Sequence, residues 1–207
     1  MSNVVLPTVG LPGEVRDEII RHAQEGKPEE VCGILWGKDW IVTRLVRGKN
    51  VAEERFENYE VDPETLLLQF DFEEQGEEMM GIYHSHPESE AYPSATDTWN
   101  AHYPKSLYFI CSLENEDAPV LRAFCLTPHS VELDWIALTT ERRFYETRPG
   151  LFALYLSEDD YGVDALANLP TSAGRPLYVV FSEEDGSPEQ GDGRVVTVEE
   201  LPIEIVS

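Results

Sequence analysis

The chain has 207 residues, with 42% hydrophobic and 10% aromatic residues and a formal net charge of −25 at pH 7, so it can bury a full core as one domain, alone or with an appendage. The negative charge repels phosphate backbones and anionic lipids, so we expect neither a nucleic-acid nor a membrane partner. No apolar run of 18 residues and no signal-peptide pattern at residues 1–9 occur, which predicts a cytoplasmic protein.

Three explanations of the acidity stay open. It steers a partner that has a basic face, it keeps the protein soluble, or it reflects halophilic adaptation.

The first quarter of the chain predicts a helix followed by a β-hairpin. Apolar residues at four-residue spacing, followed by a glycine and a proline, predict a helix over residues 12–24. Two β-rich runs, 31–36 and 40–46, are separated by three residues, which favours a hairpin. Glu30 precedes the first run, at the expected rim of a sheet, and Val-Cys-Gly33 follows it as a close-packing sequence.

A second helix, a strand and a short third helix are expected next. Asp62 and Pro63 supply an N-cap and a first-turn proline for the second helix. In that helix three apolar residues are expected to form one stripe: Leu66, Leu67 and Phe70. The run 79–86 has the composition of a strand and ends in polar, ligand-type residues, and a short helix is expected over 94–102.

The later elements complete an α/β (α+β) fold, with a central mixed β-sheet flanked by helices. Three strands are expected over residues 107–113, 120–126 and 131–138. Because Pro149-Gly150 marks a natural boundary, we predict a domain at 10–148 and a C-terminal extension at 149–207. Within the extension we expect a helix at 151–167, strands at 177–181 and 195–198, and an acidic, glycine-rich loop at 182–193. The extension adds strands, mediates dimerisation or covers the substrate groove.

The three cysteines, Cys32, Cys111 and Cys125, lie far apart in apolar runs and show no CxxC spacing. This pattern predicts reduced core residues rather than a disulfide framework or a metal cluster.

The stretch from residue 81 to residue 97 contains most of the residues that indicate a metal site. His84 and His86 are two residues apart on an expected strand, so both imidazoles point to one face and reach one ion. Asp97 supplies a third ligand, and three protein ligands leave one tetrahedral position for water, which is typical of a catalytic zinc site. A peptidase also needs a base that takes and returns a proton, and Glu30 is the candidate.

Each of these residues also has a simpler interpretation. A His-x-His pair occurs by chance, and two buried histidines are satisfied by ordinary hydrogen bonds. Ser94-Ala-Thr-Asp97 matches a helix capping box. Glu30 follows Glu29 and could be a solvated surface acid. The presence of all five residues in one order favours a catalytic metal site over these simpler interpretations.

Together these residues resemble the signature of the JAMM metallopeptidases, also called the MPN-plus family: Glu30, then His84-x-His86, seven residues, Ser94, two residues and Asp97. The resemblance extends over about residues 12–140 and implies a JAMM/MPN-type domain. The segments 50–55, 59–63, 83–86, 90–94 and 121–124 look like the bacterial peptidases that release cysteine from a sulfur-carrier protein. Pro87 departs from that subgroup, where threonine occurs, and is usual in the wider family.

The resemblance implies a zinc metallopeptidase with one Zn²⁺ per chain, held by His84, His86 and Asp97. Glu30 would be the general base and acid, and Ser94 would hydrogen-bond the oxyanion. The implied partner is a ubiquitin-like or sulfur-carrier protein with a Gly-Gly C-terminus, whose tail adds as a strand at a sheet edge.

The leaving group is open: cysteine or a short peptide tail, or a lysine side chain in a deubiquitinase-like isopeptidase reaction. Two other classes are open. One is a noncatalytic MPN scaffold, which usually lacks ligands that this chain has. The other is a RadC-like DNA-repair protein, which carries His-Asn-His-Pro-Ser-Gly where this chain has His-Ser-His-Pro-Glu-Ser.

Overall fold

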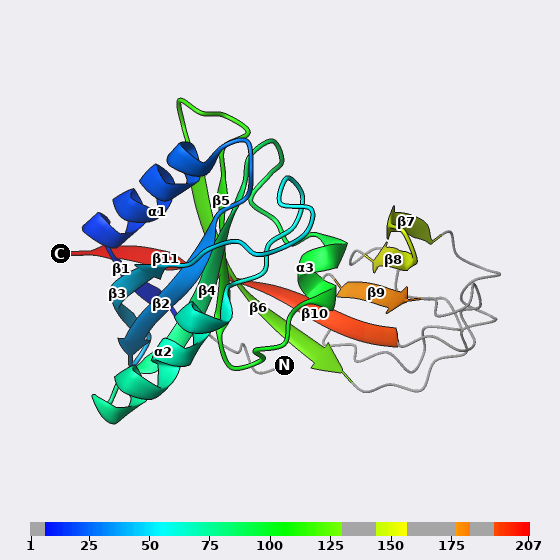
Figure 1. Cartoon of the computed structure of the whole chain (residues 1–207). Helices are drawn as coiled ribbons and strands as arrows, with labels where there is room; N and C mark the ends of the chain where they lie inside the picture. The colour runs from blue at the N-terminus through cyan, green and yellow to red at the C-terminus, as the bar shows by residue number, and fades with distance from the viewer. Residues whose placement is uncertain (1–6, 130–143, 157–176, 183–192) are drawn as a thin grey trace. The chain divides into compact units, whose positions relative to one another are not determined.

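The computed structural model describes residues 7–129, 144–156, 177–182 and 193–207 (Figure 1). The expected strand at 131–138 and most of the expected loop at 182–193 lie outside these residues. The chain divides into two compact units. Unit 1 consists of Met1–Tyr92, Lys105–Cys125 and Glu200–Ser207, and unit 2 consists of Pro93–Pro104 and Leu126–Glu199.

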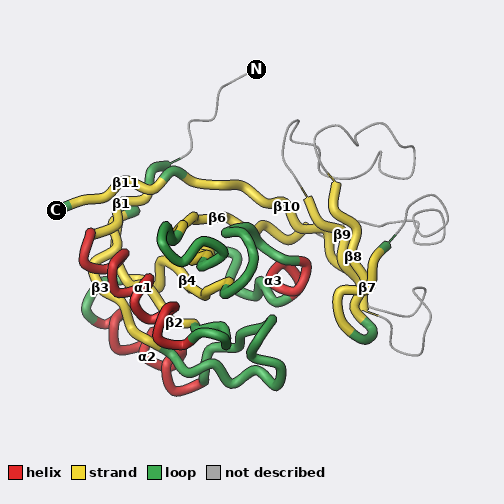
Figure 2. The backbone as a smooth tube through the Cα atoms, turned by 90° about the horizontal axis from the view of Figure 1, so that it is seen from above, coloured by secondary structure: helices red, strands yellow, loops and turns green. Residues whose placement is uncertain are grey.

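Unit 1 is built on a mixed sheet whose strands follow a curved path (Figure 2). Its strand order is β11-β1-β3-β2-β4-β5-β6. These strands are β1 (Val9–Pro12), β2 (Cys32–Lys38), β3 (Ile41–Arg47), β4 (Glu78–His86), β5 (Leu107–Ser112), β6 (Val120–His129) and β11 (Ile203–Val206). Strand β2 pairs antiparallel with β3 and with β4, whereas β4 and β5 are parallel. The predicted hairpin and the predicted mixed sheet are confirmed.

Helix α1 (Gly13–Gly26) covers one face of this sheet, as its apolar spacing predicts. Its buried residues pack into one cluster with sheet residues that include Leu35, Tyr83 and Phe109. Gly33 lies opposite Tyr83 in the β2–β4 register. A Cβ atom on Gly33 would lie 2.3 Å from the Val46 carbonyl oxygen and 2.5 Å from the Tyr83 ring, so this close approach excludes a side chain.

Helix α2 (Pro63–Glu74) begins as predicted, with the Asp62 side chain accepting a hydrogen bond from the Thr65 backbone N–H. It packs on the other face of the sheet, because Trp36 alternates with Leu35 along β2. The Trp36 and Phe72 rings lie 4.2 Å apart between centroids.

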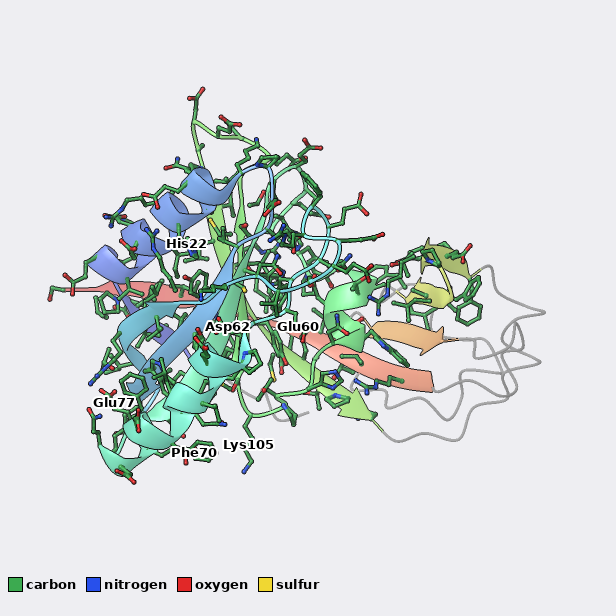
Figure 3. The ribbon with its side chains drawn as sticks, in the orientation of Figure 1. His22, Glu60, Asp62, Phe70, Glu77 and Lys105 are labelled. Carbon is green, nitrogen blue, oxygen red and sulfur yellow. The ribbon has the colours of Figure 1, made fainter. Side chains whose placement is uncertain are left out.

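The expected apolar stripe on α2 is wrong as a packing face. Leu67 and Phe70 are 60% and 57% exposed, and Figure 3 labels Phe70 at the outer side of the helix. The helix packs through Phe72 instead, two residues further on. Two residues correspond to about 200° around a helix, so Phe70 and Phe72 point in nearly opposite directions.

Among its described residues, unit 2 contains helix α3 (Ala95–Trp99) and the strands β7 (Tyr145–Arg148), β8 (Leu151–Leu156), β9 (Leu177–Ser182) and most of β10 (Gly193–Leu201), whose last two residues belong to unit 1. The four strands pair antiparallel in the order β10-β9-β8-β7. The predicted strands at 177–181 and 195–198 are confirmed.

The predicted helix at 151–167 is wrong over its first six residues, which form β8. Periodicity alone does not separate a short apolar run in a buried strand from one in a helix. Pairing with β9 satisfies the backbone of this run.

The end of the chain returns to unit 1. Strand β11 pairs parallel with β1, from Val9 with Ile203 to Pro12 with Val206. Leu201 is buried in the cluster beneath α1, and Ile203 packs against it. The fold class is confirmed, and the domain limits 10–148 and 149–207 stay a prediction. Among the described residues, no helix is both long enough and apolar enough to cross a membrane.

Candidate metal centre

Strand β4 presents its side chains alternately to the two faces of the sheet. Tyr83 packs in the cluster beneath α1. His84 and His86 therefore lie together on the opposite face, as their spacing predicts. Their side chains are 0% and 4% exposed.

The two imidazoles point their Nε2 atoms toward one another, 3.1 Å apart. Two nitrogens that each lie 2.0–2.1 Å from a tetrahedral zinc ion are about 3.3 Å apart. The observed spacing therefore fits two ligands of a single ion.

A backbone carbonyl fixes the tautomer of His86. Its Nδ1 atom lies 2.8 Å from the Glu90 carbonyl oxygen. Because a carbonyl only accepts, Nδ1 carries a proton, and in the neutral ring Nε2 then has the lone pair that a metal ligand needs.

The His84 ring stacks on Tyr59, with 4.1 Å between ring centroids and 16° between planes. Stacking restricts rotation of the imidazole. Tyr59 was not a predicted site residue, and its one sequence signal is its place in the segment 59–63.

In unit 2, Ser94 and Asp97 form the capping box of α3. The Asp97 backbone N–H donates to Ser94 Oγ at 3.1 Å, and the Ser94 N–H donates to Asp97 Oδ2 at 2.7 Å. Because Ser94 Oγ accepts in this bond, its hydroxyl proton can be donated elsewhere. The capping-box interpretation of this pair is confirmed. It is compatible with a second role for each side chain, because the Asp97 carboxylate has further acceptor sites and the Ser94 hydroxyl has a proton to donate.

The ligand-type residues His84 and His86 of unit 1 and Asp97 of unit 2 are all buried. Two imidazoles and one carboxylate suit zinc and other borderline divalent metals.

Glu30 lies between α1 and β2 in unit 1 and is buried, at 6% exposed, whereas the neighbouring Glu29 is half-buried. Its backbone is held on both sides by the loop after β3. The Glu30 N–H donates to the Arg55 carbonyl at 2.7 Å, and the Glu30 carbonyl accepts from Asn50 Nδ2 at 2.9 Å. These two bonds fix the place from which the Glu30 side chain extends.

Asn50 is a residue that sequence reasoning missed, apart from its place in the segment 50–55. Its Nδ2 group also donates to the Asn58 carbonyl, and its Oδ1 accepts from the Ala52 and Glu60 backbone N–H groups. An asparagine amide has two donors and two acceptor lone pairs, so all four are used. Asn50 therefore ties this loop to Glu30.

A cavity of about 570 Å³ in unit 1 has Glu30 in its wall, together with His22, Lys49, Asn50 and Arg55. Glu30 is therefore buried yet borders open space. Arg55 forms an ion pair with Glu29 at 3.4 Å on the same wall.

His22 is a residue of α1 and is labelled at that helix in Figure 3, and its Nδ1 atom is 2.8 Å from the Tyr83 hydroxyl. Burial, with a smaller contribution from Arg47, lowers the pKa of His22 from 6.5 to about 4. It is therefore a neutral residue of the sheet packing at physiological pH.

The cysteine prediction is confirmed. Cys32, Cys111 and Cys125 are thiols that form no disulfide; Cys32 and Cys111 are buried and Cys125 is half-buried. Burial raises the pKa of Cys32 and of Cys111 to about 12, so both stay protonated at neutral pH.

Residues 12–126 match the family described as prokaryotic homologs of the JAB domain, and the chain belongs to this family. It is 43% identical over 111 residues to the Desampylase of Haloferax volcanii, covering 50% of this chain and 80% of that protein. It is 32% identical over 116 residues to the CysO-cysteine peptidase of Mycobacterium tuberculosis, covering 55% and 79%.

A protein from Desulfitobacterium hafniense, solved in solution, has 33% identity and a TM-score of 0.53, and the match covers 58% of this chain and 85% of that one. The resemblance to JAMM metallopeptidases and the predicted enzyme class, a JAMM-type hydrolase, are confirmed.

Proposed function

We propose that this chain is a zinc metallopeptidase that hydrolyses an amide or isopeptide bond after the C-terminal Gly-Gly tail of a ubiquitin-like or sulfur-carrier protein. The histidine pair of β4 carries the proposal, because its two Nε2 atoms converge at 3.1 Å and one tautomer is fixed. Membership of the JAB-domain family supports the same chemistry.

His84, His86 and Asp97 would hold one Zn²⁺ ion. The nitrogen spacing and the buried donor set fit this ion. When bound, zinc supplies a Lewis acid that activates water and polarises a carbonyl group.

Glu30 is proposed as the general base and then the general acid. Its carboxylate takes a proton from the attacking water, the water oxygen bonds to the carbonyl carbon, and the C–N bond breaks as Glu30 returns the proton to the leaving amine. The two hydrogen bonds that Arg55 and Asn50 form with the Glu30 backbone support a fixed position for this transfer.

Ser94 is proposed to donate its hydroxyl proton to the oxyanion of the tetrahedral intermediate. Its Oγ already accepts from the Asp97 backbone N–H, so the hydroxyl is oriented as a donor. One such donor contributes about 3 to 4 kcal/mol to transition-state stabilisation in other oxyanion holes.

Release of cysteine or a short tail from a sulfur carrier is the reaction that we favour, and the CysO-cysteine peptidase supports it by its name. Removal of a small ubiquitin-like modifier from lysine is the second candidate, because the relative with 43% identity is named Desampylase and not a cysteine peptidase. The proposed setting is the cytoplasm, which the three reduced cysteines favour.

The test measures zinc content and cleavage of a Gly-Gly-terminated carrier joined to cysteine or to lysine. Wild type, Glu30→Gln and the control Glu29→Gln are compared, because the two substitutions make the same chemical change at neighbouring positions. We expect one zinc per chain in all three, with turnover in wild type and Glu29→Gln only.

Two results would contradict parts of the proposal. Wild type without zinc would favour the noncatalytic scaffold. Full turnover in Glu30→Gln would show that Glu30 is not the general base.

A further inference from the structure

The loop of residues 87–92 follows His86 and is held at three successive carbonyl groups. Each accepts a side-chain hydrogen bond: Ser89 from Ser112 Oγ at 2.6 Å, Glu90 from His86 Nδ1 at 2.8 Å, and Ala91 from Arg122 Nη1 at 3.2 Å. Because the Glu90 carbonyl orients the His86 ring, the bonds on either side of it determine where that ring points.

Arg122 is itself held by Glu200. Its Nε donates to Glu200 Oε1 at 2.8 Å and its Nη2 to Oε2 at 2.5 Å, so the pair is bidentate. The guanidinium also lies over the rings of Tyr92 and Phe124, 5.7 and 5.1 Å from their centroids. The guanidinium group is planar, and Glu200 holds its Nε and Nη2 atoms. The Nη1 atom therefore points in one direction, toward the Ala91 carbonyl.

Glu200 lies on β10, beyond residues 12–126 that match the family. The same strand carries Arg194 in unit 2. The Arg194 Nη1 atom donates to the Trp99 carbonyl at 2.6 Å, and its guanidinium lies 4.8 Å from the Trp99 ring centroid. Trp99 ends α3, the helix whose first turn holds Asp97.

We propose that β10 is a positioning strand for the metal ligands. Glu200 acts through Arg122 and the 87–92 loop on His86, and Arg194 acts through Trp99 on the helix that bears Asp97. The inference rests on the proposed function in that it takes His86 and Asp97 as zinc ligands. It gives the C-terminal extension a role in the site that the rest of the chain forms.

A positioning role and a purely structural role predict different results. A structural ion pair would change the stability of the metal-free protein and leave zinc affinity unchanged. A positioning pair would weaken zinc binding, by about 3- to 10-fold, below the 10- to 100-fold typical of groups bonded directly to a metal ligand.

The experiment uses the full chain and measures zinc affinity by competition with a chromophoric chelator. Glu200→Gln and Arg194→Gln are compared with Glu204→Gln, which makes the same change as Glu200→Gln on the exposed strand β11. Urea unfolding of the metal-free variants measures stability separately. We expect weaker zinc binding in the first two variants only, with no matching loss of stability.

A second measurement needs neither zinc nor substrate. The Tyr92 backbone N–H donates to the Glu90 carbonyl at 2.9 Å, so its amide exchange reports on the 87–92 loop. We expect several-fold faster exchange at Tyr92 in Glu200→Gln than in wild type or Glu204→Gln.

The outcomes separate the two proposals. If wild type binds zinc and cleaves no conjugate while Glu200→Gln still weakens zinc binding, the proposed function fails and the positioning role stands. If wild type binds no zinc, amide exchange at Tyr92 tests the role of Glu200, and faster exchange in Glu200→Gln supports it. Unchanged zinc affinity with unchanged exchange in Glu200→Gln overturns the inference, and unchanged zinc affinity in Arg194→Gln overturns its α3 part.

Discussion

The two faces of β4 use buried polar groups in opposite ways. On the core face, which α1 covers, His22 Nδ1 meets the Tyr83 hydroxyl at 2.8 Å, and these two groups satisfy one another. On the histidine face, His84 and His86 direct their Nε2 atoms at one another, while His86 uses its Nδ1 on a carbonyl. The two faces therefore differ in the groups that the described ring nitrogens meet, and burial alone does not separate the structural histidine His22 from the proposed metal ligands.

The largest expected effect lies on the histidine face. His86→Ala removes one of three proposed ligands, so we expect zinc affinity to fall by more than about 100-fold, beyond the range for indirect partners, and turnover to disappear. Chelator competition and the carrier-cleavage assay measure the two effects. His22→Ala is the matched control on the core face and should keep its zinc. Equal zinc loss in both variants would show that the two faces of β4 do not differ in metal binding.

The core face should show the reverse pattern. Tyr83 is fully buried against Gly33 and Phe109, so Tyr83→Ala leaves a large cavity and should lower the free energy of unfolding by about 3 to 5 kcal/mol. Urea unfolding of the metal-free protein measures this. A variant that keeps its stability and loses zinc would show that Tyr83 serves the metal centre instead of the core.

A smaller effect is expected from pH. The pKa of His22 is lowered from 6.5 to about 4, mainly by burial, so between these values the unfolded chain binds more protons than the folded one. The free energy of unfolding therefore falls as pH falls from about 6.5 to 4. The full shift corresponds to about 3 kcal/mol, and solvent screening of this half-buried ring reduces the expected loss to about 1 to 2 kcal/mol.

Urea unfolding at pH 7 and pH 5 measures this dependence in wild type and in His22→Gln. The variant should lose most of the difference between the two pH values. Glu25 and Glu200 have pKa values lowered by hydrogen bonds from arginines, so their contributions are lost below about pH 4.5 and lie outside this interval. An unchanged pH dependence in His22→Gln would show that His22 is not the group that titrates.

Local patterns were sufficient to predict much of the fold and the residues of the candidate site. The period-2 pair on β4, the cap at Asp62 and the box at Ser94 depend on neighbours within a few residues. Strand β11 was missed because its partner β1 lies almost 200 residues away, at Val9 against Ile203. Asn50 was missed as the clamp on Glu30 because its role depends on the folded path of the 50–60 loop. Glu200 was missed for the same reason, since Arg122 meets it only after β10 returns to unit 1.

The smallest expected effect tests how α2 covers the histidine face. Phe70 is 57% exposed, so Phe70→Gln should change the free energy of unfolding by less than about 0.5 kcal/mol. The Phe72 ring packs against Trp36, and its centroid lies 4.7 Å from the Arg44 guanidinium carbon, so Phe72→Ala on the same helix should cost about 2 kcal/mol or more. Urea unfolding of both variants gives the contrast. Equal losses would mean that Phe70 is covered in solution, and the apolar stripe expected from the sequence would then be a packing face after all.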